Sequence, residues 1–185
     1  MRSSSFLIVC LGSLLIFQSC RRKNAGEAEN QKADSTLTLY SEYYDFESLS
    51  DPGVNTEKAV SGQKSEMVND KTEYAFGFKK RFQEMSSYRS IREINVSFKC
   101  WMEKKFPDAT FVISIDDSTE TKNIMWEGKP IVCPKDASWN DIRYNFKLNP
   151  SFIQPGSVLK LYIWNKGKNK FYYDDLAFDF VKLKK

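Results

Sequence analysis

Apolar and polar side chains alternate along most of the chain after residue 37. In Asp141–Leu148 every second residue is apolar, which is typical of a strand with one face in a core. The alternation recurs in five further segments, with apolar positions Tyr74/Phe76/Phe78/Phe82, Ile94/Val96/Phe98/Cys100, Phe111/Ile113/Ile115, Leu159/Leu161/Ile163 and Leu176/Phe178/Phe180. Strands with one apolar face usually pair antiparallel, so the pattern predicts antiparallel sheets.

Turn-forming residues separate these segments, namely Asp51-Pro52-Gly53, Ser61-Gly62, Glu127-Gly128 and Pro155-Gly156. Beyond the first twenty residues only 81–93 offers a turn or two of helical pattern. About seven or eight short strands divided in this way predict an all-β domain, an antiparallel two-sheet β-sandwich. We place this domain at residues 37–185.

The first twenty residues read as a secretion signal. The apolar run Phe6–Phe17 has twelve positions, too few for a bilayer core, which needs about 20 residues. It is followed by Gln18-Ser19-Cys20, which resembles the lipobox of bacterial lipoproteins. That resemblance implies a signal helix at 1–19 that is removed and a lipid, such as palmitate, on Cys20. The alternative is a plain secretion signal in which Cys20 is incidental.

The residues after Cys20 predict a tether beside a membrane. Arg21, Arg22 and Lys23 would lie against anionic headgroups. The segment 24–36 has no large apolar residue and no period, as in a flexible linker, so residues 20–36 form the tether. Because Arg21 rather than Asp follows the cysteine, the lipoprotein resemblance implies the outer membrane of a Gram-negative cell. An acidic stretch that resembles surface-export signals is missing, which favours a domain that faces the periplasm.

Composition excludes several kinds of chemistry. The chain has no histidine, so His-dependent triads, dyads and zinc sites are impossible. Aromatic residues make up 15% of the chain, which favours β-structure. The formal net charge of +4 includes no arginine cluster beyond the tether, so nucleic acid is not an expected partner.

Four short motifs resemble the galactose-binding-like jelly rolls that serve as carbohydrate-binding modules: Tyr44-Asp45-Phe46-Glu47, Ser61-Gly62-x-x-Ser65, Leu161–Asn165 and Tyr173–Phe178. The resemblance covers about residues 40 to 181 and implies a jelly roll with a structural calcium where the first and last strands meet. Its matching ligands are Asp45, Glu47 and Asp174, with Asp175 as a fourth candidate. The alternative is that Asp174 pairs with a lysine or arginine, or caps one end of the sandwich.

The strand parity also predicts a surface for a ligand. If Ile94, Val96 and Phe98 face the core, Lys99 and Trp101 face away from it. The same argument on the later strand turns Lys160, Tyr162 and Trp164 outward. We predict that these five residues form an exposed platform on which a sugar ring stacks. The alternative is that loops or a second layer cover the rings, and Trp126 and Trp139 are expected as core or loop anchors.

Two cysteines remain after removal of the signal and acylation of Cys20. Cys100 and Cys133 form an even pair in an oxidising compartment, which predicts a disulfide. Two separate buried thiols are the open alternative.

These observations predict a membrane-anchored, non-catalytic lipoprotein that binds glycan. A carboxylate-based glycosidase would need two carboxylates flanking one cleft, and we do not expect an enzyme. The alternative function is a periplasmic structural or protein-interaction lipoprotein with the same fold, whose aromatic face is buried against a partner protein.

Overall fold

The computed structural model describes residues 36–103 and 108–184, except for the side chain of Phe76. The predicted signal, Cys20 and nearly all of the tether lie outside the described residues, so that division of the chain stays a prediction. Within the described ranges no helix is both long and apolar enough to cross a bilayer.

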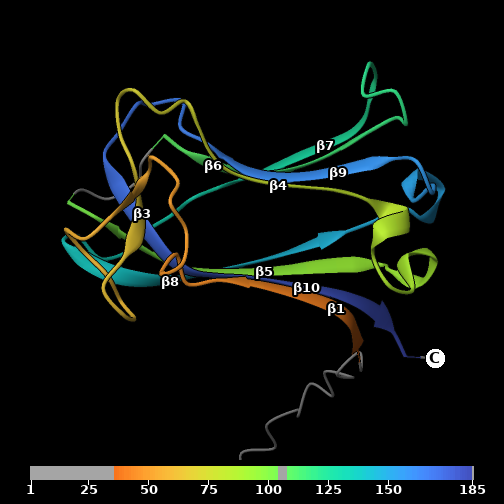
Figure 1. Ribbon diagram of the computed structural model, residues 1–185, viewed down its shortest axis with the longest axis horizontal. Helices are drawn as coiled ribbons and strands as arrows, with labels where there is room; N and C mark the ends of the chain where they lie inside the picture. The colour runs from red at the N-terminus through yellow and green to blue at the C-terminus, as the bar shows by residue number, and fades with distance from the viewer. Residues whose placement is uncertain (1–35, 104–107, 185) are drawn as a thin grey trace, which may run out of the picture. The chain divides into compact units, whose positions relative to one another are not determined.

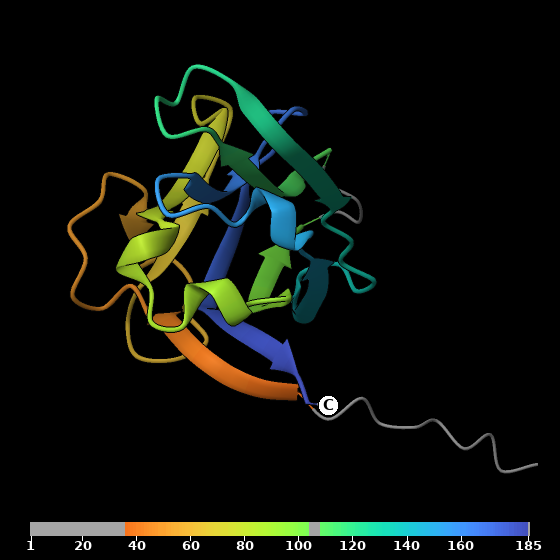
Figure 2. The same ribbon diagram turned by 90° about the vertical axis from the view of Figure 1, so that its right-hand side faces the viewer.

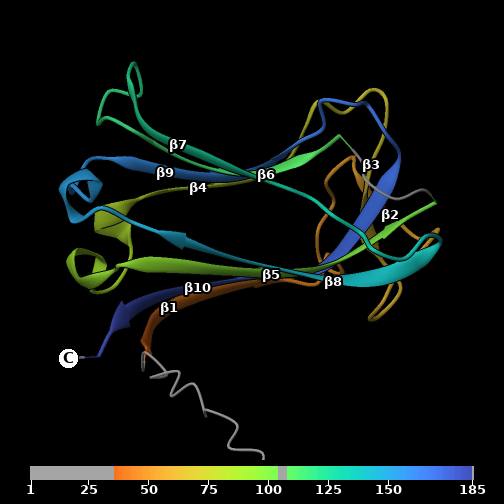
Figure 3. The same ribbon diagram turned by 180° about the vertical axis from the view of Figure 1, so that it is seen from behind.

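The described residues form two antiparallel sheets that lie face to face in two layers (Figures 1 and 3). The larger sheet has the order β2 (Val54–Asn55), β3 (Ser65–Val68), β10 (Phe171–Leu183), β5 (Glu93–Met102) and β8 (Ser138–Lys147), and β1 (Thr36–Tyr44) also pairs with β10. The smaller sheet has the order β4 (Tyr74–Arg81), β9 (Val158–Trp164), β6 (Thr110–Asp116) and β7 (Asn123–Pro130). The predicted all-β sandwich is confirmed.

Short 3-10 helices lie at one end of the sandwich, which faces the viewer in Figure 2. They are η1 (Phe82–Glu84), η2 (Tyr88–Ser90) and η3 (Pro150–Phe152). The first two occupy the 81–93 segment, in which the sequence offered only a turn or two of helix. Phe82, which opens η1, is fully buried.

The core lies between the sheets and combines aromatic rings with a larger number of aliphatic side chains. β5 alternates between partly exposed and buried residues along its whole length, as its sequence predicts. Phe98 of β5 meets Phe111 of β6 across the layers, with ring centroids 5.8 Å apart, and Phe178 of β10 meets Phe78 of β4 at 5.6 Å. Burying a side chain of this size contributes about 1.5–3 kcal/mol, so contacts across the two layers hold the sheets together.

Strand β4 departs from the predicted alternation. Ala75 pairs with Ile163 and Gly77 pairs with Tyr162, so one extra residue lies between two positions that are adjacent on β9. This β-bulge reverses the parity of the residues before it. Tyr74, which the alternation assigned to the core, therefore lies on the outer face with 59% of its surface exposed. That assignment was wrong because a bulge cannot be seen in the apolar pattern.

Candidate functional site

Four aromatic side chains gather on the outer face of the smaller sheet, and we call them the aromatic face: Tyr74, Trp126, Tyr162 and Trp164. Tyr162 and Trp164 point outward because Leu161 and Ile163, which alternate with them on β9, are fully buried. Tyr74 reaches this face through the bulge in β4, and Trp126 comes from β7. The surface thus combines residues from three strands.

The rings of the aromatic face hold one another in place. Tyr74 stacks on Trp164 with centroids 6.4 Å apart and planes only 13° from parallel, and it meets Tyr162 edge-on at 5.8 Å. Trp126 meets Trp164 edge-on at 6.4 Å, and its Nε1 donates a hydrogen bond of 3.3 Å to the Tyr162 hydroxyl. Tyr74 and Trp126 are nevertheless 59% and 51% exposed. The face is therefore preorganised and accessible.

Trp126 lies over a glycine that makes room for it. A Cβ atom placed on Gly128 would come within 2.7 Å of the indole ring and within 2.6 Å of Cγ2 of Thr110. Thr110 is itself buried, since it lies on β6, which has β9 and β7 as neighbours on its two sides. The missing side chain at position 128 therefore allows the indole to lie against the sheet.

A charged network borders the aromatic face. Lys160 Nζ lies 2.5 Å from Asp116 Oδ2 and 3.4 Å from Glu120 Oε2, and Lys79 Nζ lies 2.6 Å from the same Glu120 oxygen. The hydrogen bond to Asp116 raises the pKa of Lys160. Lys160 is thus a fixed cation beside Tyr162, within one face that offers both rings and polar groups.

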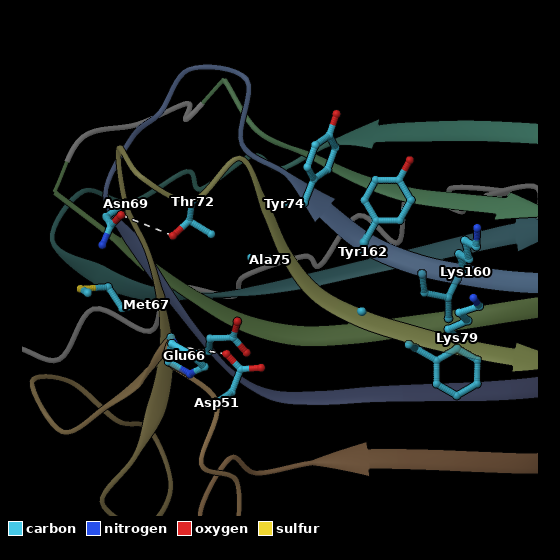
Figure 4. A pocket seen from close by; sticks show the side chains of 15 residues that line it. Asp51, Glu66, Met67, Asn69, Thr72, Tyr74, Ala75, Lys79, Lys160 and Tyr162 are labelled. Atoms are coloured by element: carbon cyan, nitrogen blue, oxygen red, sulfur yellow. Dashed lines mark hydrogen bonds between the residues drawn. The ribbon is translucent and has the colours of Figure 1, made fainter.

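A cavity of about 620 Å³ adjoins the aromatic face at strand β4, and we call it the edge pocket (Figure 4). Tyr74, Tyr162, Lys79 and Lys160 line one side of it, and the loop 51–53 and strand β3 line the other. In Figure 4 the rings of Tyr74 and Tyr162 lie on one side of the β4 ribbon and the side chains of Asp51 and Glu66 on the other. The pocket is an extension of the aromatic face past the edge of the sheet.

The structure divides the predicted platform between two sheets. Tyr162, Trp164 and Lys160 share the outer face of the smaller sheet, but Trp101 and Lys99 lie on β5 of the larger sheet. Residues facing outward from different sheets of a sandwich lie on opposite sides of the molecule, so the prediction of one five-residue platform was wrong. Parity along a strand tells which residues face away from the core, but it does not tell which sheet the strand joins.

Trp101 and Lys99 have other partners. The ammonium of Lys58 lies 3.8 Å from the centroid of a Trp101 ring, and Tyr172 meets this indole edge-on at 5.6 Å. Lys99 Nζ lies 2.5 Å from Asp141 Oδ1. Trp101 is therefore partly covered, as the alternative interpretation held for its ring.

Sequence reasoning missed Tyr74 and Trp126. The expectation of Trp126 as a core or loop anchor was wrong, since the residue is half exposed on β7. The glycine two positions after it, on the same face of the strand, was the one available signal that a large ring had room there.

The carboxylates expected to bind calcium accept backbone N–H groups instead. Asp174 is fully buried; its Oδ2 accepts from Val60 N at 2.8 Å and Ser61 N at 3.3 Å, and its Oδ1 accepts from Asp175 N. Burial raises the pKa of Asp174, although these hydrogen bonds oppose the rise.

The other two candidate ligands are occupied in a similar way. Glu47 Oε1 accepts from the amides of Gln63 and Lys64, and Asp45 Oδ1 accepts from Glu47 N. Among the described residues no three acidic or cysteine side chains come close enough together to hold a metal ion. The three carboxylates in this arrangement do not form the site that the resemblance implies, and calcium stays a prediction.

Cys100 and Cys133 are free thiols in the structure, and both are buried. They interact with each other, because a hydrogen bond with Cys133, together with burial, raises the pKa of Cys100. The structure therefore brings the predicted pair together in reduced form, and the bridge itself stays a prediction.

The comparisons with known proteins bear on the fold. No family model matches the chain, and no curated protein matches its sequence. Among solved structures it is similar to the CBM22-1 xylan-binding domain of Paenibacillus barcinonensis Xyn10C, at 16% identity and a TM-score of 0.50, over 82% of this chain and 99% of that one. It is also similar to the CBM22-1–CBM22-2 tandem domain of the same protein, at 17% identity and a TM-score of 0.54, over 83% of this chain and 48% of that one. The chain thus has the β-sandwich fold of carbohydrate-binding modules.

Proposed function

We propose that this protein is a non-catalytic glycan-binding β-sandwich that takes up a polysaccharide chain on the aromatic face. The observation that carries the proposal is the set of four contacting aromatic rings on one face, two of them more than half exposed. Large rings left in water on a folded surface usually mark a place of interaction. Because the rings already contact one another, little ordering is needed when a ligand arrives.

The chemistry of the face suits a sugar. The C–H faces of a pyranose ring are apolar and pack on aromatic rings, while its hydroxyl groups need hydrogen-bond partners at the rim. Tyr74 and Trp126 offer the rings, and the charged network around Lys160 and Glu120 offers the polar groups. One of the two similar structures, the CBM22-1 domain, is a xylan-binding domain, which supports xylan as the first polysaccharide to try.

We further propose that Cys20 carries the lipid anchor and that the domain faces the periplasm from the outer membrane. The support is the short apolar run, the position of the cysteine and the basic residues after it. An anchored binding domain of this kind would hold glycan chains near the periplasmic face of that membrane.

Affinity electrophoresis through gels containing single polysaccharides tests glycan binding. We expect at least one neutral polysaccharide to retard the protein and Tyr74→Ala to weaken retardation by about tenfold or more. Tyr43→Ala is the matched control, because Tyr43 is also 59% exposed but lies on β1 of the larger sheet. Absence of retardation in every gel, with a protein co-purifying from cells, would instead favour the interaction lipoprotein.

A further inference from the structure

Three cations converge on one carboxylate at the border of the aromatic face. Glu120 Oε2 lies 2.6 Å from Lys79 Nζ and 3.4 Å from Lys160 Nζ. Its other oxygen, Oε1, lies 3.5 Å from Arg81 Nη2. Lys79 and Arg81 come from β4 and Lys160 comes from β9, whereas Glu120 lies in the turn between β6 and β7. One side chain of the turn therefore neutralises cations that two other strands present.

Two of these cations lie directly opposite each other in the sheet. Lys79 of β4 is the register partner of Lys160 of β9, and Figure 4 shows the two side chains next to each other beside Tyr162. Like charges in this position destabilise a sheet. Lys160 also pairs with Asp116, but Glu120 is the one acidic partner of Lys79 within the described ranges. Glu120 therefore offsets the repulsion between the two lysines.

Hydrogen bonds fix the turn that carries Glu120. Asp117 Oδ1 accepts from three backbone amides farther along the turn. Arg81 Nη1 donates to the carbonyl oxygen of Ser118 at 3.1 Å and to that of Gly156 at 2.8 Å. The carboxylate of Glu120 is therefore held in place against the cations of β4 and β9.

The backbone of Glu120 has the left-handed conformation, with a φ angle of 57°. Glycine adopts this conformation freely, whereas a residue with a Cβ atom is strained in it. Backbone strain of this kind motivates a search for a function of the side chain. A glycine would form the turn with less strain but could not pair with the three cations, so the ion pairs are what the glutamate adds.

The two lysines lie where a glycan on the aromatic face would meet them. Lys79 and Lys160 line the edge pocket together with Tyr74 and Tyr162, and they are the cations among the described residues that line it. A hydrogen bond from Lys79 lowers the pKa of Glu120, so this carboxylate is ionised at neutral pH. A sugar carboxylate beside these lysines would therefore be repelled by Glu120. Without Glu120 the same two ammonium groups would attract it.

We propose that Glu120 determines the specificity of the aromatic face, by restricting it to neutral glycans over glycans that carry carboxylates. This inference rests on the proposed function, because it concerns a ligand bound on that face. Glu120 acts by occupying Lys79 and Lys160, which would otherwise bind the carboxylate of an acidic sugar.

The test is isothermal titration of the full chain with two derivatives of the neutral polysaccharide that retards the wild type. One derivative is lightly carboxymethylated and the other is hydroxyethylated to the same degree, so the substituents are similar in size and differ in charge. We expect the wild type to bind the hydroxyethyl form about threefold or more tightly than the carboxymethyl form. Glu120→Gln should shift this ratio by about fivefold or more toward the carboxymethyl form, and about 0.5 M salt should remove the shift.

Two further variants and one control identify the cause of the shift. Glu120→Gly should give the same shift, because glycine favours the φ angle at this position. Adding Lys79→Met to Glu120→Gln should abolish most of the shift, because it removes the ammonium that Glu120 had neutralised. Asp141→Asn is the matched control, since it releases Lys99 on the larger sheet, and it should keep the wild-type ratio.

The outcomes separate this inference from the proposed function. If the wild type binds the neutral polysaccharide but Glu120→Gln and Glu120→Gly keep its ratio, the inference is overturned. An equal shift in Asp141→Asn would also overturn it, because net charge alone would then be the cause. If no polysaccharide binds the wild type, the proposed function fails and the inference fails with it. Should Glu120→Gln not fold, the ratio measured with Glu120→Gly decides.

Discussion

Gly128 is the residue on which the position of Trp126 depends. Any side chain there collides with the indole ring at 2.7 Å and with Thr110 at 2.6 Å. We expect Gly128→Ala to displace the ring, to weaken glycan binding by about tenfold and to leave the fold intact, since the displaced groups are side chains on the outer face. Near-ultraviolet circular dichroism measures the ring displacement, and titration measures the affinity.

Gly77→Ala is the control for this substitution. It adds the same methyl group on the same sheet, where nothing lies within 4 Å. Its aromatic dichroism should match the wild type. A Gly128→Ala variant with the aromatic dichroism and the affinity of the wild type would contradict the assigned role of Gly128.

Asp174 shows what a buried carboxylate needs. Replacing it by alanine removes the acceptor for three amides, of Val60, Ser61 and Asp175, and should lower the free energy of unfolding by about 1–3 kcal/mol. Urea denaturation measures this difference, with the exposed Asp136→Ala as control.

The pH dependence of that difference has a definite sign. Burial raises the pKa of Asp174 above its ordinary value of 3.8, so between the two pKa values the folded state binds more protons than the unfolded state. The stabilisation is therefore present in full below pH 3.8 and declines as the pH rises through the raised pKa. A difference that grew with pH would contradict this account.

Melting with chelator and with millimolar calcium tests the implied cation, whose binding would raise the melting temperature.

At the scale of elements, the alternation of side chains predicted the strands but not their neighbours. The outward positions of Tyr162 and Trp164 follow from the buried Leu161 and Ile163 on a regular strand. The assignment of β5 and β9 to different sheets depends on pairings between segments far apart in the chain, which no local pattern encodes. The bulge that puts Tyr74 on the outer face also could not be predicted locally, because a bulge exists only in the pairing of β4 with β9.

A disulfide between the two cysteines would link the two sheets covalently. Cys100 lies on β5 of the larger sheet, and Cys133 follows β7 of the smaller one. In an oxidising compartment we expect a disulfide, which closes a loop of about 34 residues and contributes roughly 3 to 4 kcal/mol in the chain-entropy model. Alkylation of the denatured, unreduced protein measures it, and full labelling of both thiols would rule the bridge out.

At the scale of the whole molecule, the sequence predicts that the domain is tethered to a membrane. Mass spectrometry of the mature chain should find a lipid on Cys20, and Cys20→Ala should move the protein from the detergent phase to the soluble fraction. An unmodified N-terminus at another residue would contradict the anchor. The proposed glycan site is tested separately from the anchor, because the aromatic face lies on strands β4, β7 and β9 of the domain.

Glycan binding on the aromatic face is the central claim, and titration of one matched pair of variants tests it most directly. Tyr74 and Tyr43 are equally exposed, but only Tyr74 stacks on Trp164. With the polysaccharide that retards the wild type, we expect Tyr43→Ala to bind within about twofold of wild type and Tyr74→Ala to bind at least about tenfold more weakly, while both keep their stability within about 1 kcal/mol. Equal affinities for the two variants would contradict the claim.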